Sequence, residues 1–256
     1  MDSSAHLAID RLTKVYERGQ VVALKDLSFA IDKGEFLVVI GLSGSGKSTL
    51  LRCINRLIEP TSGRIRFENL ELTKLPASQM RRARRGMGMV FQHFNLVSRS
   101  KVLTNVLAGR LGYLNPALSV VNRFPKADIE KAHAQLARVG LEEKAGARAD
   151  ELSGGQQQRV GVARAMMQDP EIMLADEPVA SLDPVLAHSI MQYLERINQD
   201  DGVMVLCSLH FLDLVHQYAD RVIALNEGKL VFEGTPQEID DDKFKEIYGK
   251  EAERVG

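Results

Sequence analysis

The stretch Gly41-Leu42-Ser43-Gly44-Ser45-Gly46-Lys47-Ser48-Thr49 decides the fold of this chain. It follows an apolar run at 36–40, and the apolar residues at 50, 51, 54 and 57 behind it have helical spacing. A loop between such a strand and helix brings backbone N–H groups and a helix N-terminus up to a phosphate, which a plain Gly/Ser linker does not. The pattern predicts a phosphate loop in which Lys47 holds the β- and γ-phosphates of a nucleotide and Ser48 coordinates Mg²⁺.

The composition is that of a globular chain without a strong charge bias. The 256 residues can bury a full core, and a net charge of −1 gives no overall attraction to nucleic acid or to an anionic membrane. Cys53 and Cys207 both lie in apolar segments, which predicts small core residues rather than a disulfide or a metal site. No apolar run is long enough to cross a bilayer and residues 1–6 do not resemble a signal peptide, so we expect neither membrane insertion nor export.

Alternating apolar segments around the phosphate loop predict an antiparallel β-layer. We expect strands at 8–12 and 21–24 around a turn at 18–20, then at 27–31, and an outer strand at 64–67. The basic cluster at 81–85 predicts the solvated face of a short helix rather than a nucleic-acid patch, because aromatic residues do not accompany it. A short strand at 87–91 then delivers the amide of Gln92 to a strand end, where ligands of open α/β sheets bind.

Residues 95–149 are rich in helix formers and predict an inserted helical subdomain, with Leu111 in its first helix. The apolar stretch 113–124 fits either a partner surface or a locally packed loop.

The segment Leu152-Ser153-Gly154-Gly155-Gln156 (the signature segment) opens another helix, with Ser153 as its N-cap. The two glycines bare N–H groups at the positive end of that helix, which predicts a second anion site.

Two carboxylates, Asp176 and Glu177, follow the apolar strand predicted at 172–175. Charges beside an apolar core need a partner, and a bound cation supplies one. Pro178 favours extended backbone angles at Glu177, so we expect the two side chains to diverge, with Asp176 toward Mg²⁺ and Glu177 toward the attacking water. After a helix that begins at 181–184, the strand predicted at 203–207 brings His210 to the same edge of the sheet. A hairpin at 222–232 and a helical tail at 236–256 complete the chain.

The order of these motifs resembles that of the ATP-binding subunits of ABC transporters, and the signature segment is the most specific of them. The resemblance covers nearly the whole chain. It implies an α/β fold: a phosphate-loop NTPase core with a mainly parallel sheet flanked by helices, an antiparallel β-layer and an inserted helical subdomain. The single nucleotide-binding domain, 1–256, would comprise the β-layer and loop core (1–94), the helical subdomain with the signature (95–160), the rest of the core (161–235) and the tail (236–256).

The resemblance also implies residue roles. Glu177 would be the general base or water-orienting residue, His210 would hold the γ-phosphate and Gln92 would sense Mg²⁺ and water. The ATP site would comprise Tyr16, stacked on adenine, with Gly41, Leu42, Ser43, Gly44, Ser45, Gly46, Lys47, Ser48 and Thr49. The signature segment, Leu152, Ser153, Gly154, Gly155 and Gln156, would bind the ATP of a second copy. Asp183 would lie at that dimer contact, and Mg²⁺ would be held by Ser48, Gln92 and Asp176.

The cofactors implied are ATP and Mg²⁺, and the partners are a second copy of the chain, two transmembrane permease subunits and an extracytoplasmic phosphonate-binding protein, without nucleic acid. Such a subunit lies on the cytoplasmic face of the cell membrane. The runs 51–57, 91–97, 109–113 and 176–184 look like the phosphonate-importer branch, where amino-acid importers usually carry Thr-Ser-Ala in place of Val179-Ala180-Ser181. Ser208-Leu209-His210-Phe211 departs from that branch, which leaves open whether the solute is an alkylphosphonate, phosphite or a relative. An ATPase for a polar amino-acid importer and a soluble ABC ATPase of cluster assembly are the alternatives.

Overall fold

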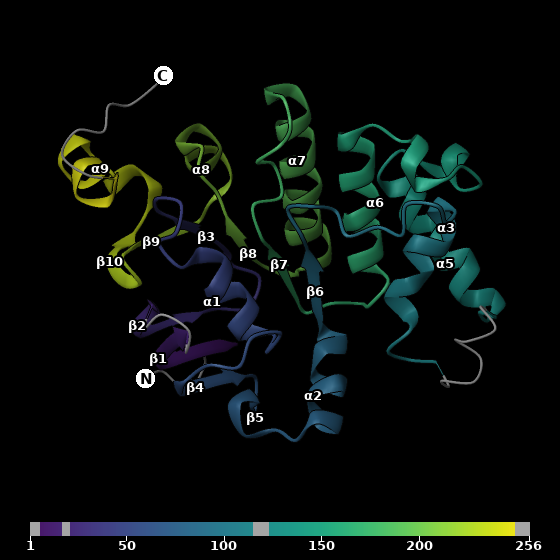
Figure 1. Cartoon of the computed structure of the whole chain (residues 1–256). Coiled ribbons are helices and arrows are strands. Elements are labelled where there is room, and N and C mark those ends of the chain that lie inside the picture. The colour runs from purple at the N-terminus through teal and green to yellow at the C-terminus, as the bar shows by residue number, and fades with distance from the viewer. Residues whose placement is uncertain (1–5, 17–20, 115–122, 249–256) are drawn as a thin grey trace.

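The computed structural model describes residues 6–16, 21–114 and 123–248, and Figure 1 shows their arrangement. Within these ranges the strands form two sheets. The first is antiparallel, in the order β2-β1-β4-β5, with β1 Leu7–Tyr16, β2 Val21–Ile31, β4 Ser62–Phe67 and β5 Leu70–Glu71. The second has the order β10-β9-β3-β8-β7-β6, with β3 Phe36–Ile40, β6 Met87–Val90, β7 Ile172–Ala175, β8 Met204–Ser208, β9 Arg221–Asn226 and β10 Lys229–Gly234.

The second sheet is parallel from β9 to β6, and only β10 at its edge pairs antiparallel. The helices are α1 Lys47–Ile54, α2 Ala77–Ala83, α3 Val102–Leu107, α5 Lys126–Arg138, α6 Gly154–Met166, α7 Pro184–Asp201, α8 Leu212–Tyr218 and α9 Asp241–Tyr248. Short 3₁₀ turns are η1 Leu72–Lys74, η2 Arg84–Gly86, η3 Ala108–Arg110, η4 Glu142–Lys144, η5 Ala149–Glu151 and η6 Pro236–Glu238. Helices α3, α5 and α6 gather at one end of the molecule, beyond β6 (Figure 1).

Strand β3 separates two hydrophobic cores. Its Phe36, Val38 and Ile40 join a core that extends into the helical region, while Leu37 and Val39 join a core shared with α1 and the antiparallel sheet. All five residues are buried. A strand buried on both faces needs an unbroken apolar sequence, which is why the run at 36–40 predicts β3 from the sequence alone.

The fold class and most of the predicted elements are confirmed. The segments 21–24 and 27–31 are parts of one strand, β2, joined across Asp26, whose φ is +54°. The expectation that Leu57 continues the α1 helix is wrong, because the helix ends at Ile54 and the Asn55 side chain accepts the backbone N–H of Leu57 at 3.0 Å. Leu111 likewise lies just beyond η3 and is exposed.

The structure also bears on the cysteines and on the tail. Cys53 and Cys207 are buried free thiols, as predicted, and burial raises the pKa of Cys53 to about 11. The tail forms α9, which buries Ile247. The turn predicted at 18–20, residues 115–122 of the apolar stretch and the last residues of the tail lie outside the described residues. Among the helices described, none combines the length and apolar character that a bilayer crossing requires.

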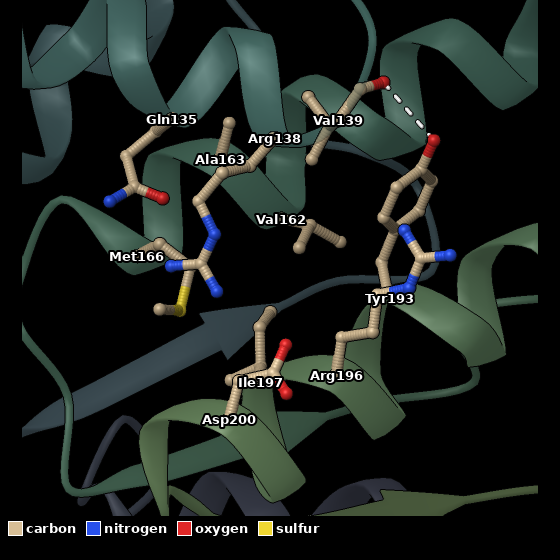
Figure 2. Close-up of a pocket in the computed structure, with 10 residues that line it drawn as sticks. All are labelled: Gln135, Arg138, Val139, Val162, Ala163, Met166, Tyr193, Arg196, Ile197 and Asp200. Carbon is tan, nitrogen blue, oxygen red and sulfur yellow. Dashed lines mark hydrogen bonds between the residues drawn. The ribbon is translucent and has the colours of Figure 1, made fainter.

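A cavity lies where the helical region contacts α7. A cavity of about 240 Å³ lies between α5, α6 and α7, with Arg138 of α5 and Arg196 of α7 on opposite sides of it (Figure 2). Beside it the Tyr193 hydroxyl of α7 donates a hydrogen bond to the carbonyl of Val139 at 3.3 Å. This polar contact adds to the shared apolar core that joins the helical region to α7.

Candidate active site

The candidate site lies along one edge of the parallel sheet. Strands β6, β7 and β8 run side by side, with Val90 paired to Ala175 and Ala175 to Cys207. Strand β3 is parallel to β8, so the carboxyl ends of all four strands meet at this edge. The phosphate loop, Gln92, the Asp176-Glu177 pair and His210 all follow these ends in the sequence. Residues far apart in the chain are therefore brought together by strand order alone.

The phosphate loop joins β3 to α1, and two of its glycines are required by close packing. At Gly41, φ is +139° and an added Cβ would lie 2.2 Å from the carbonyl oxygen of Leu225. At Gly46, φ is +109° and the Cβ would lie 2.5 Å from the carbonyl oxygen of Ala23. The loop is thus clamped between β9 and β2 at its two ends. Between them Leu42, Ser43 and Gly44 are exposed, so this part of the loop is accessible to a ligand.

Lys47 is buried at the first position of α1, with 3% of its surface exposed. Its Nζ donates hydrogen bonds to the carbonyls of Gly41 at 2.8 Å and Leu42 at 3.1 Å, and lies 3.7 Å from Oε1 of Glu177. Burial lowers the pKa of Lys47, while Glu177 and Asp176 oppose that shift. The ammonium group is held at the base of the loop, with a carboxylate facing it across the site.

Asp176 is also buried, at 1% exposure, and its charge is balanced by protein groups. Its Oδ2 accepts a hydrogen bond from Arg52 at 3.0 Å, and its Oδ1 accepts one from the Ser208 hydroxyl at 3.5 Å. The cation predicted beside this charge stays a prediction. Within the protein itself, Arg52 of α1 and Ser208 at the end of β8 already contact the carboxylate.

Glu177 diverges from Asp176, as expected, but by a different backbone route. The prediction that Pro178 holds Glu177 extended is wrong, because its φ is +48°, in the left-handed region. The strain is held in place because the Glu177 N–H donates to the Ser208 hydroxyl at 2.9 Å and its carbonyl accepts from the N–H of Ala180 at 3.3 Å. The side chain then lies 2.6 Å from Nε2 of His210.

The signature segment opens α6 with the predicted cap. The Ser153 hydroxyl accepts the backbone N–H of Gln156 at 3.4 Å, and the Gln156 side chain accepts the N–H of Ser153 at 3.0 Å. Gly155 packs against α7, since an added Cβ would lie 2.9 Å from Leu186. Ser153 and Gly154 are exposed, and β6, β7 and α7 separate α6 from α1 in Figure 1. The structure does not bring this segment to the phosphate loop of its own chain.

Three more predicted residues, Tyr16, Gln92 and Asp183, lie at the ends of separate elements. Tyr16 ends β1 beside α1, its hydroxyl 3.4 Å from that of Thr49, and its side chain is exposed. Gln92 is half-buried two residues beyond β6. Asp183 caps α7, accepting the N–H of Leu186 at 3.0 Å, and it is exposed. Tyr16 therefore adjoins the start of α1, and Gln92 follows the end of β6. Asp183 lies between Leu182 and Leu186, whose side chains lie close to Gly154 and Gly155 of the signature segment.

Sequence reasoning missed two residues, Arg52 and Ser208. Arg52 lies four residues after Ser48, on the same face of α1, so its position toward the site was readable from helix spacing. Ser208 ends β8, the strand next to β7, and its hydroxyl contacts both Asp176 and the backbone of Glu177. Without knowledge of the strand order, nothing in the sequence pairs Ser208 with these carboxylates.

The loop, buried lysine and paired carboxylates at the end of a parallel sheet define a phosphate-loop nucleotide-binding protein. The chain belongs to the ABC transporter family, whose model matches residues 24–180. It is 53% identical over 97% of its length to the "Phosphonates import ATP-binding protein PhnC" of Bdellovibrio bacteriovorus, covering 95% of that protein. It is 49% identical over 98% of its length to the protein of the same name from Staphylococcus aureus strain USA300, covering 99% of it.

Solved structures of the family have the same fold. A dimeric ATP-binding cassette in a post-hydrolysis state, bound to ADP and inorganic phosphate, matches 90% of this chain with a TM-score of 0.79 and 33% identity, over 98% of its own length. The ADP conformation of a cassette from an ABC transporter matches 95% of this chain with a TM-score of 0.82 and 29% identity, over 96% of its own length. This chain is thus an ATP-binding cassette by sequence and by fold.

Proposed function

We propose that this chain is the ATP-hydrolysing subunit that powers the import of phosphonates, or of phosphite-like compounds, through an ABC transporter. The observation that carries the proposal is the identity of about half of all residues, over nearly full length, to proteins named as phosphonates import ATP-binding proteins. The cytoplasmic face of the cell membrane is its proposed location. The four-part division at residues 94, 160 and 235 is retained as the proposed domain organisation.

ATP is proposed to bind along the phosphate loop, with its adenine against Tyr16. Exposed loop residues 42–44 and the start of α1 present N–H groups to the phosphates. Lys47 supplies a fixed positive charge, because its two carbonyl acceptors hold the ammonium in place before the nucleotide arrives. A preordered charge of this kind favours the triphosphate without further rearrangement.

Glu177 is proposed to orient and deprotonate the attacking water. In this structure its carboxylate contacts His210 at 2.6 Å and faces Lys47 at 3.7 Å, so two groups suited to a γ-phosphate are engaged by the carboxylate instead. The γ-phosphate would compete for both, and His210 would then donate to a phosphate oxygen. Glu177, released from His210, becomes free to accept the proton of water.

The residues present fit Mg²⁺, which accompanies ATP in this class of site. Ser48, Asp176 and Gln92 offer hydroxyl, carboxylate and amide oxygens, the donors that Mg²⁺ prefers. When bound, the ion neutralises charge on the β- and γ-phosphates. Asp176 is held for this role by Arg52 and Ser208, which fix both of its oxygens at the sheet edge.

A second copy is proposed to complete the site. The exposed Ser153-Gly154 end of α6 does not meet its own phosphate loop, whereas it is free to bind the γ-phosphate held by another chain. Asp183, also exposed, would lie at that contact. ATP then gains contacts only in the closed pair, which shifts an open–closed equilibrium, and hydrolysis removes the phosphate that links the halves.

The permease contact is proposed at a groove beside Gln92. A cavity of about 280 Å³ lies between the core and the helical region, and its lining includes Leu57, Phe91, Gly112 and Tyr113. The groove has a basic rim formed by Arg81, Arg84 and Arg85. A protein partner at this groove accounts for the basic cluster without a nucleic acid. A short helix of a transmembrane subunit would fit this groove, and its movement would be transmitted to Gln92, just beyond the end of β6. The extracytoplasmic binding protein acts through that permease.

The test is ATP hydrolysis by the chain assembled with two permease subunits and a binding protein. The binding protein is loaded in turn with an alkylphosphonate, phosphite, phosphate or a polar amino acid. We expect stimulation by the phosphonate or phosphite. Stimulation by the amino acid alone would overturn the substrate assignment, and failure to assemble with any permease would overturn the transport role.

A further inference from the structure

A second group of ionisable side chains lies far from the candidate active site. His6 immediately precedes β1, Glu68 follows β4 and Glu171 precedes β7. Because Asp176 follows β7 while Glu171 precedes it, this group lies at the opposite end of that strand from the nucleotide site. It also joins the two sheets, since β1 and β4 belong to one and β7 to the other.

The three side chains converge. Nδ1 of His6 lies 3.9 Å from Oε1 of Glu68, and Nε2 of His6 lies 3.6 Å from Oε2 of Glu171. One nitrogen or oxygen from each residue lies within 4.8 Å of those of the other two. These separations are too long for hydrogen bonds to the imidazole. A single ion takes one nitrogen of the ring, and the 4.8 Å spacing of one atom from each residue is compatible with three ligands of one ion.

His6 is the buried member of the group. Its side chain is only 10% exposed, and among the described residues its Nε2 has no hydrogen-bond partner although it lies 3.6 Å from Glu171. The ring is held edge-on against Phe67, with centroids 5.1 Å apart and planes at 73°. Burial lowers the pKa of His6, and the nearby Glu68 opposes that shift. A buried ring nitrogen without a partner is costly unless something binds it.

The two carboxylates are unfavourably close without a cation. Burial raises the pKa of Glu171, and the neighbouring Glu68 raises it further, while only Lys33 opposes the shift. Backbone hydrogen bonds fix the main chain at both glutamates: the N–H of Glu68 donates to the carbonyl of His6 at 2.7 Å, and that of Glu171 to the carbonyl of Gly86 at 2.8 Å. The two negative charges repel each other, and a cation bound between them would remove that repulsion.

Access to the group is open. Glu68 and Glu171 are about half exposed and line a cavity of about 310 Å³, together with Gly86, Gln79 and Arg82. The two carboxylates are therefore accessible to an ion from solvent. Water could occupy the coordination positions that the three residues leave open.

We propose that His6, Glu68 and Glu171 bind a divalent transition-metal ion, best matched by Zn²⁺, which bridges the antiparallel sheet and the parallel sheet. One imidazole nitrogen and two carboxylate oxygens form a mixed donor set that suits Zn²⁺ better than Mg²⁺, which prefers oxygen alone. The ion would neutralise both carboxylates. This site is independent of ATP and of the transported solute.

The test is a Zn²⁺ titration, by calorimetry, of the chelator-treated full-length chain in the absence of nucleotide. We expect one equivalent to bind, and His6→Ala to weaken binding by at least ~10-fold, since even an outer-shell change at metal sites has an effect of that order. Glu68→Gln, at an exposed position, should weaken it as well and serves as a variant that leaves the buried packing intact. His216→Ala, at an exposed histidine of helix α8, is the matched control and should bind as the parent does.

A second readout separates this site from the nucleotide site, which also contains a histidine and a carboxylate. The proposal predicts that His210→Ala retains the Zn²⁺ affinity of the parent and that bound Zn²⁺ raises the unfolding temperature of the parent but not of Glu68→Gln. Equal Zn²⁺ affinity in the parent, His6→Ala and Glu68→Gln would overturn it. Loss of binding in His210→Ala alone, or no saturable binding in the parent, would overturn it equally.

Discussion

Replacing Glu177 with glutamine is the sharpest perturbation of the proposed mechanism. The substitution keeps the length and hydrogen-bonding capacity of the side chain but removes its negative charge. The contact with His210 at 2.6 Å can persist through the amide oxygen, and Lys47 keeps its bonds to two backbone carbonyls. The site should therefore stay assembled while losing its proton acceptor.

The expected effect differs between chemistry and binding. Loss of a positioned general base costs about 10²–10⁴ in rate, so turnover should fall by that factor, or roughly 3–5 kcal/mol in the barrier. ATP affinity should be retained or increased, because a carboxylate that faces Lys47 at 3.7 Å no longer competes with the γ-phosphate for that charge. Slow hydrolysis with retained binding should hold two chains together.

The assay measures ATPase turnover, nucleotide affinity and molecular mass by light scattering with and without Mg-ATP. Glu177→Gln should bind ATP and form a stable dimer only in its presence. The control is Glu143→Gln, the same substitution at an exposed residue of η4, and it should behave as the parent does. Undiminished turnover in Glu177→Gln would refute its role as base, and loss of ATP binding would refute the reasoning that the site stays assembled.

Three further changes test the supporting structure. Arg52→Ala removes the charged partner of buried Asp176 and should lower the free energy of unfolding by about 1–3 kcal/mol in urea, a loss that Asp176→Asn in the same chain should reduce. Gly41→Ala should cost at least ~1–3 kcal/mol through backbone strain and should abolish ATP binding in a fluorescent-nucleotide assay, since its Cβ would meet the Leu225 carbonyl. Ser153→Ala should cost about 1 kcal/mol of stability by loss of the cap, and it should reduce turnover more than ATP binding to the isolated chain. Unchanged urea midpoints for Arg52→Ala, normal nucleotide binding by Gly41→Ala, or unchanged turnover in Ser153→Ala would contradict the respective argument.

Local sequence patterns predicted those elements whose cause is local. The buried run at 36–40 and the Ser153 cap were correct because an apolar strand and a capped helix depend on neighbours in the chain. The backbone of Glu177 was predicted wrongly for the opposite reason. The local preference imposed by Pro178 is overridden by a hydrogen bond to Ser208, which lies in another strand.

The sequence by itself determined the phosphate loop, the carboxylate pair, the signature segment and their order, because each is a short motif with its own physical logic. Only the tertiary structure decided which groups meet. The parallel order of β6, β7 and β8 places Ser208 against Asp176 and Glu177, and the path of α1 brings Arg52 to Asp176, a contact that no local pattern predicts. Likewise, the arrangement of the two sheets places His6, next to β1 of one sheet, beside Glu171, next to β7 of the other. Such contacts join residues distant in the chain, so their energies depend on strand order and not on any local pattern.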